Sequence, residues 1–141
     1  MNIPKSLTTI GADAFASCTI GTCHYNGTVD EWVNIDFGNM DANPMSKSNG
    51  NHINGTIIYE VETSSATAIK DYAFANCISL ESITLPNSVE IMGNYVFSGC
   101  TSFKKMNSDI DGVLALPTSL TIIPSSAFSG CAEISKVLIG D

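Results

Sequence analysis

The chain has 141 residues, 44% of them hydrophobic, which is enough apolar material for one compact unit and gives no reason to expect two separate cores. The chain has 14 acidic residues against six lysines and no arginine. It therefore has few positive charges with which to bind a phosphate backbone, and nucleic-acid binding is disfavoured. No apolar run approaches the roughly 20 residues that span a bilayer, and Met1–Pro4 lacks the basic start and apolar core of a signal peptide. We expect a single domain over residues 1–141 that does not insert into a membrane.

One motif, Ala/Val-Phe-Ala/Ser-x-Cys, recurs along the whole chain, at Ala14–Cys18, Ala73–Cys77, Val96–Cys100 and Ala127–Cys131. Three copies follow an Ile/Leu-Pro-x-Ser-Leu/Val segment, and the copy at Ala73 lacks this proline. Successive Phe positions are separated by 23 residues, once with 36 more and once with eight more. A period between about 20 and 29 residues is typical of leucine-rich repeats, in which each coil buries its apolar face only against the next.

The 36 extra residues predict an insertion over about 21–62, after the first coil. Asn26-Gly27 is a turn dipeptide, and Thr28–Glu31 has the spacing of a capping box, so a short helix should carry Trp32 inward. We expect a small flap that covers one side of the stack and re-enters it through a strand over Thr56–Val61.

The regular coil that follows predicts a short strand and one helical turn. Leu80, Ile83 and Leu85 are spaced to point inward from a strand that ends at a proline. Phe103–Met106 and Ile134–Ile139 occupy the matching places, so a parallel sheet with one strand per coil is expected. The segment Asp71–Cys77 is too short for a long helix and predicts one helical turn on the opposite wall.

The eight extra residues predict an expanded connection over about 107–114. Asn107–Gly112 has an Asp-x-Asp-Gly sequence like that of a calcium loop, but no acidic residue follows at the position of the closing ligand. A plain polar turn is the alternative, which we favour.

These patterns together resemble the BspA-type leucine-rich repeats of bacterial surface proteins. The resemblance rests on the Pro-x-Ser segment, the Ala-Phe-x-x-Cys motif, the Leu-x-x-Ile strand, and the insertion with Tyr25, Trp32 and Asn43-Pro44-Met45. It implies a right-handed solenoid of about four coils. Because neither end of the chain reads as a polar capping coil, we expect a fragment of a longer array, whose coil ends could associate end to end.

Cysteines and histidines offer little chemistry. Cys18, Cys77, Cys100 and Cys131 share one place in the repeat, which predicts a column of buried free thiols rather than disulfides or redox sites. Cys18, Cys23, His24 and His52 form the only grouping that could hold zinc, and their spacing matches no zinc pattern. Asn26 and Asn54 begin glycosylation sequons that we interpret as turns. We expect no catalytic residue, no cofactor and no metal.

The remaining candidate is a surface for a partner. Along the strands the residues expected to face outward form a patch more basic than the rest: Glu81, Ser82, Thr84, Lys104, Lys105, Ser135, Lys136 and Leu138. The alternative is a solvated sheet face with a Glu81–Lys104 pair. Tyr25 and Trp32 are either further partner anchors or the core of the flap.

The resemblance implies a cell-surface or secreted module that adheres to proteins or glycans of host, matrix or other cells. A structural spacer that recognises nothing is the alternative, and a thiol or metal enzyme is a third, disfavoured class. Lysine-to-serine replacement at Lys104, Lys105 and Lys136 should abolish binding if the patch is a contact surface, and should change nothing in a spacer.

Overall fold

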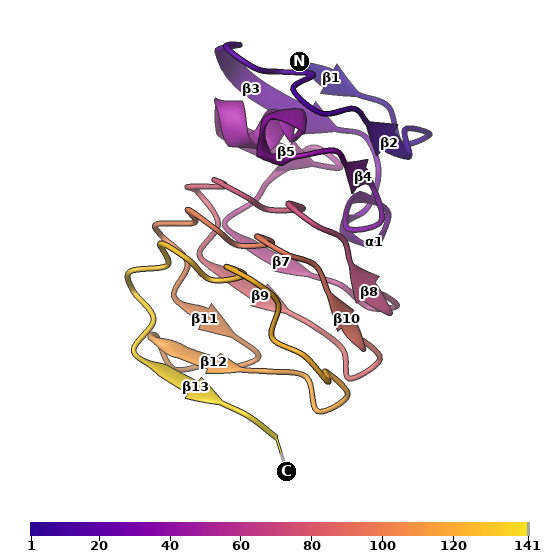
Figure 1. Ribbon diagram of the computed structural model, residues 1–141. Helices are drawn as coiled ribbons and strands as arrows, with labels where there is room; N and C mark the ends of the chain where they lie inside the picture. Colours follow the sequence, from indigo (N-terminus) through magenta and orange to yellow (C-terminus); the bar gives the residue numbers. More distant parts are fainter. Residues whose placement is uncertain (141) are drawn as a thin grey trace.

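The computed structural model describes residues 1–140 as a stack of coils made of very short strands joined by turns, with the two chain ends at opposite ends of the stack (Figure 1). The strands are β1 Asn2–Ile3, β2 Thr9–Ile10, β3 Ile20–Tyr25, β4 Asp36–Phe37, β5 Ser48–Ile53, β6 Thr56–Ile57, β7 Glu60–Glu62, β8 Ala68–Ile69, β9 Ser82–Thr84, β10 Ile91–Met92, β11 Lys105–Met106, β12 Val113–Ala115 and β13 Lys136–Leu138. The helical elements are α1 Val29–Trp32 and two 3₁₀ turns, η1 Met40–Ala42 and η2 Pro44–Lys47. Within residues 1–140, no helix is long and apolar enough to cross a membrane.

The strands of the C-terminal coils form a five-stranded sheet in the order β13-β12-β11-β9-β7, with every pair parallel. β9 pairs with β11 through Ser82 and Lys105, and β12 pairs with β13 through Val113 and Lys136. In both pairs the two residues are separated in the sequence by the 23-residue period of the repeat. A second row, β8 and β10, runs along the neighbouring wall.

The insertion is not a flap. Residues 21–45 form a coil of their own, because β3 pairs in parallel with β1 and β4 pairs in parallel with β2. The Phe15 N–H also donates to the carbonyl of Asp41 at 3.0 Å, so the two coils stay in contact along the turn wall. β5 then pairs in parallel with β3. After β5 the chain reverses at a tight turn, where Asn54 and Gly55 have φ of 48° and 77°, and continues as β6, which pairs antiparallel with β5. The predicted strand over Thr56–Val61 is therefore split between two sheets.

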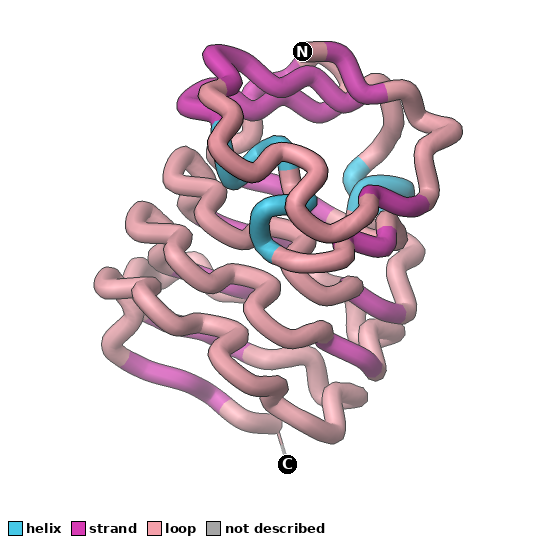
Figure 2. Tube along the Cα trace, turned by 45° about the horizontal axis from the view of Figure 1, so that its top comes forward, coloured by secondary structure: helices cyan, strands magenta, loops and turns pink. Residues whose placement is uncertain are grey.

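The Ala-Phe segments are not helical turns. In Figure 2 the helical turns all lie in the N-terminal coils, and the C-terminal coils consist of strands and loops alone. Each segment instead has two residues with positive φ, four positions apart: Asp13 and Ser17, Tyr72 and Asn76, Tyr95 and Gly99, Ser126 and Gly130. A left-handed residue ends a helix, so each segment becomes two successive tight turns.

The expanded connection adds a strand that the sequence analysis missed. The loop after β11 turns back so tightly that β12 pairs directly with β11, Lys105 opposite Val113. Gly112 closes this loop with a φ of 83°, and its N–H donates to the carbonyl of Lys104 at 2.7 Å. Val113–Leu116 followed by Pro117 repeats the pattern of Ser82–Leu85 followed by Pro86, which is why it forms a strand.

The core is one cluster of buried side chains that extends from Ile3 to Cys131. Phe97 lies at its centre, with its ring stacked on Phe74 at 5.7 Å, Phe128 at 5.5 Å and Phe103 at 4.7 Å between centroids. From Phe74 onward, the Phe of each repeat therefore packs on the Phe of the next, as expected for coils that cannot bury their apolar face alone.

Candidate interaction surface

The strand face is not basic. Lys104 forms ion pairs with Glu81 at 2.9 Å and Asp111 at 3.7 Å, and Lys105 lies 3.7 Å from Glu60. The hydrogen bond that the Lys104 ammonium donates to Glu81, and the charge of Asp111, raise the pKa of Lys104. Both lysines are thus neutralised by nearby carboxylates, and the predicted basic patch is wrong. The predicted Glu81–Lys104 pair is present.

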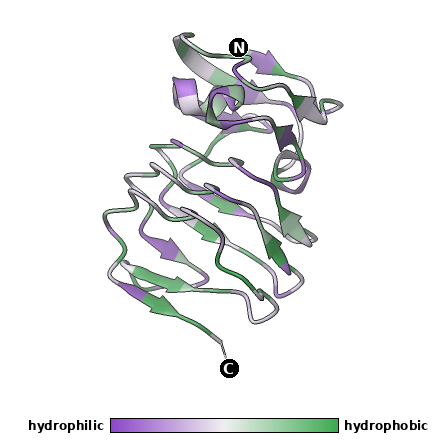
Figure 3. Cartoon of the chain, in the orientation of Figure 1, coloured by the Kyte–Doolittle hydropathy of each residue, from purple (hydrophilic) through white to green (hydrophobic). Residues whose placement is uncertain are grey.

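The residues predicted for this patch do not all lie together. Ser82 is only 8% exposed, whereas Thr84, Ser135 and Lys136 are exposed. β12 inserts between β11 and β13, so Lys136 lies two strands away from Lys105. At the usual strand spacing this is about 10 Å. Figure 3 shows that the inserted strand differs in hydropathy from its neighbour, with apolar β12 beside polar β11.

Tyr25 and Trp32 cannot be partner anchors in this fold, because both are buried, with exposures of 1% and 0%. Their rings pack edge to face at 5.1 Å, and the Trp32 indole Nε1 donates to the carbonyl of Ala73 at 2.8 Å. Tyr25 and Trp32 belong to the core between the inserted coil and the C-terminal coils. The prediction that they are partner anchors is therefore wrong.

Asn43 donates to the same Ala73 carbonyl as Trp32, and in the sequence it stood out only as part of the resemblance. The Asn43 amide Nδ2 donates to the carbonyls of Tyr72 at 2.8 Å and Ala73 at 3.0 Å, and its Oδ1 accepts from Met45 N–H at 2.9 Å. Between regular coils these contacts are made by the backbone, as when Phe74 N–H donates to the carbonyl of Val96. Where the inserted coil meets the Tyr72–Cys77 turns, the side chains of Trp32 and Asn43 therefore take the place of the backbone N–H donors.

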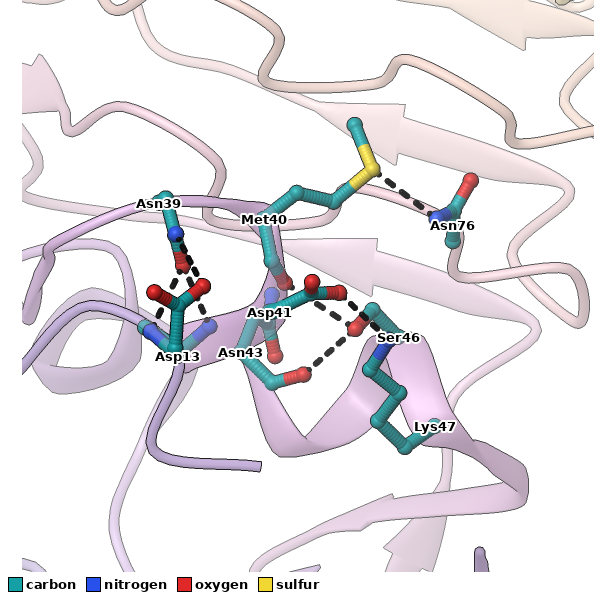
Figure 4. A network of polar contacts seen from close by, with 9 residues as sticks. Asp13, Asn39, Met40, Asp41, Asn43, Ser46, Lys47 and Asn76 are labelled. Carbon is teal, nitrogen blue, oxygen red and sulfur yellow. Dashed lines mark hydrogen bonds and ion pairs between the residues drawn. The ribbon is translucent and has the colours of Figure 1, made fainter. Parts of the chain in front are cut away.

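Further polar contacts surround Asn43 (Figure 4). The Asn39 amide donates to the carboxylate of Asp13 at 2.7 Å, and Asn76 Nδ2 approaches the sulfur of Met40 at 3.0 Å. Lys47 pairs with Asp41 within the same segment. These contacts fix residues 39–47 against the first coil on one side and the Tyr72–Cys77 turns on the other.

Asp30 fixes the opposite wall of the inserted coil. Its carboxylate accepts hydrogen bonds from the Ser64 N–H at 3.3 Å, the Ser64 hydroxyl at 3.2 Å and the Ser65 N–H at 3.2 Å. Burial alone would raise the pKa of this carboxyl, but the hydrogen bonds from Ser65 and Ser64 outweigh it and lower the pKa. The stabilisation is present above the unfolded pKa and is lost as the pH falls through the lowered one.

Three adjoining hollows run across the strand face, and the sequence analysis gave no sign of them. The first, about 570 Å³, lies between Thr84–Asn87 and Asn107–Asp109. The second, about 320 Å³, shares Thr84 and Asn107–Asp109 with it and continues over Lys105 to Glu60–Glu62. The third, about 270 Å³, shares Glu60–Glu62 with the second and continues to the β5–β6 hairpin and the start of α1. The hollows adjoin one another at these shared residues, and we call the three together the strand-face groove.

The cysteine column is buried except at its first member. The thiols of Cys100 and Cys131 donate to the carbonyls of Phe74 and Phe97 in the preceding coil, at 2.9 Å and 3.2 Å. Burial raises the pKa of Cys77 and Cys131 to about 11 and that of Cys100 further, and Cys23, also buried, has a pKa of about 11 for the same reason. Cys18 is exposed, so the prediction of a buried thiol is wrong there.

We expect only Cys18 to react when the folded protein is exposed to an aromatic disulfide reagent. The other four thiols are buried and hold their protons, and the thiolate is the reactive form. Absorbance should report one fast equivalent per chain in buffer and all five in guanidinium. Two fast equivalents, or a Cys18→Ser variant that still reacts, would contradict this assignment.

The histidines, the calcium-like loop and the two sequons form no metal site among the described residues. Among the described residues, no group of three His, Cys, Asp or Glu side chains is arranged to hold a metal ion. His24 and His52 stack on neighbouring strands with their ring centroids 4.5 Å apart. Asp111 of the calcium-like loop faces Lys104, and Asn26 and Asn54 are exposed next to turns.

Among solved structures, the chain is similar to the crystal structure of a leucine rich cell surface protein from Faecalibacterium prausnitzii A2-165, with 18% identity and a TM-score of 0.45. The similarity covers 98% of this chain and 52% of that one, so the chain spans about half the length of that protein. No curated protein matches the chain. The profile of the family described as "BspA type Leucine rich repeat region" matches six copies over residues 1–45 and 55–141, and the protein therefore belongs to the BspA-type leucine-rich repeat family.

Proposed function

We propose that this chain is an interaction module of a cell-surface or secreted protein, and that it binds a protein or glycan partner on host, matrix or other cells. The observation that carries the proposal is the strand-face groove, which crosses β7, β9 and the loop after β11. Solenoid proteins use the extended surfaces of their stacked repeats for binding, and leucine-rich repeats are in general interaction scaffolds. The lining of the groove supplies carboxylates, hydroxyls and amides for polar contacts.

The partner meets mainly Thr84, Asn107, Ser108 and Asp109, which line two of the three hollows. Glu81, Lys104 and Lys105 hold the rim in place through their ion pairs rather than acting as free charges. Ser135 and Lys136 lie farther along the sheet and contribute only to a partner large enough to reach β13. Self-association through the coil ends stays a prediction.

The test is binding of the purified chain to an array of extracellular-matrix proteins and glycans. A Thr84→Arg variant places a long charged side chain in the groove, and Thr101→Arg makes the same change at an exposed position that does not line it. We expect at least a ten-fold loss of affinity for Thr84→Arg, equal to about 1.4 kcal/mol, and none for Thr101→Arg. Silence across the array would favour the spacer, and equal loss in both variants would exclude the groove.

A further inference from the structure

β7 leaves one edge of the five-stranded sheet open. It is the last strand in the order β13-β12-β11-β9-β7. The carbonyl of Tyr59 accepts from Ser82 N–H at 3.1 Å, and the Thr63 N–H donates to Thr84 at 3.0 Å, so the odd-numbered residues face β9. Because backbone direction alternates along a strand, the N–H and C=O groups of Glu60 and Glu62 point the other way. No strand among residues 1–140 pairs with them there.

Beside this edge lies the third hollow of the groove. Its walls are apolar on the side of the β5–β6 hairpin and α1, with Val29, Ile53, Ile57 and Ile58, and Val61 of β7 completes it. A volume of about 270 Å³ accommodates one or two aliphatic side chains. The hairpin strand β6 is itself the edge of the N-terminal sheet, so the hollow separates two sheets that do not join.

Two carboxylates mark the outer face of the same strand. Glu60 and Glu62 are both exposed, on either side of buried Val61. The Glu60 carboxylate forms an ion pair with Lys105 at 3.7 Å, and the Glu60 side chain is still 66% exposed. Glu62 has no ion pair among the described residues. Opposite charges placed directly across two neighbouring strands stabilise the pairing.

We propose that the open edge of β7 binds an extended, basic segment of a partner protein as an added strand. The partner's backbone would pair with the N–H and C=O groups of Glu60 and Glu62. Its inward side chains, aliphatic, would enter the third hollow, while its outward side chains, Lys or Arg, would face the two carboxylates. In this mode of recognition main-chain hydrogen bonds give affinity and alternate side chains give specificity.

This inference rests on the proposed function and narrows its partner to a cationic, strand-forming peptide. The competing explanation is that Glu60 and Glu62 guard the edge, since charged side chains on edge strands discourage pairing. A guarded edge predicts no binding of a complementary peptide, so the two explanations give opposite results.

The probe is a fluorescein-labelled peptide of sequence Lys-Val-Lys-Val-Lys, titrated with the whole chain at low salt and followed by fluorescence anisotropy. A peptide with Glu in place of each Lys is the charge control. Two further peptides carry N-methyl groups, one on the valine amides and one on the lysine amides. An added strand predicts that one of these two loses binding at least ten-fold while the other retains it, because only alternate N–H groups face β7.

The protein variant is Glu60→Gln with Glu62→Gln, and its matched control is Glu90→Gln with Glu133→Gln, which removes the same charge at exposed positions outside the groove. We expect Glu60→Gln with Glu62→Gln to lower the affinity for the lysine peptide about ten-fold, and Glu90→Gln with Glu133→Gln to leave that affinity unchanged. Equal weakening by both variants, or indifference to N-methylation, would overturn the proposal, because either would mean binding by net charge alone. Array binding that survives Glu60→Gln with Glu62→Gln, without peptide binding, would overturn the edge site and leave the proposed function standing.

Discussion

Replacing Asn43 by alanine is expected to lower the free energy of unfolding by about 3 kcal/mol. The side chain is 0% exposed, and it makes three hydrogen bonds, two to the carbonyls of Tyr72 and Ala73 and one from Met45 N–H. Alanine removes all three and leaves buried groups short of partners, each costing about 1 kcal/mol or more. Urea unfolding followed by circular dichroism measures the difference.

Asn39→Ala is the matched control, since the same side chain caps η1 four residues earlier at a half-exposed position. Water can replace its hydrogen bonds, so a loss of about 1 kcal/mol is expected. Asn43→Asp keeps the acceptor for Met45 but turns a carboxylate toward two carbonyls, which disfavours the charged form. That variant should therefore regain stability as the pH falls. Equal losses for Asn43→Ala and Asn39→Ala would mean that the junction does not depend on Asn43.

The repeat motif predicted much of the C-terminal stack. Leu80–Leu85, Phe103–Met106 and Ile134–Ile139 each contain a strand of the parallel sheet, because the spacing of apolar residues within a short segment is a local signal. β12 was missed because Val113–Ala115 begins inside the expanded connection, where the period is interrupted. Left-handed turns could be suspected at Gly99 and Gly130 but not at Tyr72 and Tyr95, since aromatic residues rarely adopt positive φ.

The inserted coil and the candidate surface depended on contacts between distant residues. Nothing near Trp32 in the sequence shows that its indole reaches Ala73, and without that contact an aromatic residue on an insertion resembles a partner anchor. Lys105 looked free because Glu60 comes close to it only when β7, β9 and β11 stack. The third hollow of the groove likewise arises where two sheets fail to join, which is a property of packing rather than of any one segment.

Replacing Gly99 by alanine is expected to cost about 2–3 kcal/mol, through two separable effects. Gly99 has a φ of 76°, where a side chain on an L-residue is strained by about 1 kcal/mol. A Cβ there would also lie 2.0 Å from Oδ1 of Asn76, the residue at the same place in the preceding coil. Asn76 would have to turn away and lose its contact with Met40.

Gly55→Ala isolates the first effect, because Gly55 has a φ of 77° and nothing within 4 Å of the added carbon, so a loss of only about 1 kcal/mol is expected. Asn76→Gly isolates the second, since it removes the obstructing side chain and copies the glycine that later coils have at this place. In that background Gly99→Ala should cost no more than Gly55→Ala, and the double-mutant cycle should return a coupling of about 1 kcal/mol. Additive losses would show that the coils do not press on each other at this turn, and that backbone strain alone makes glycine necessary there.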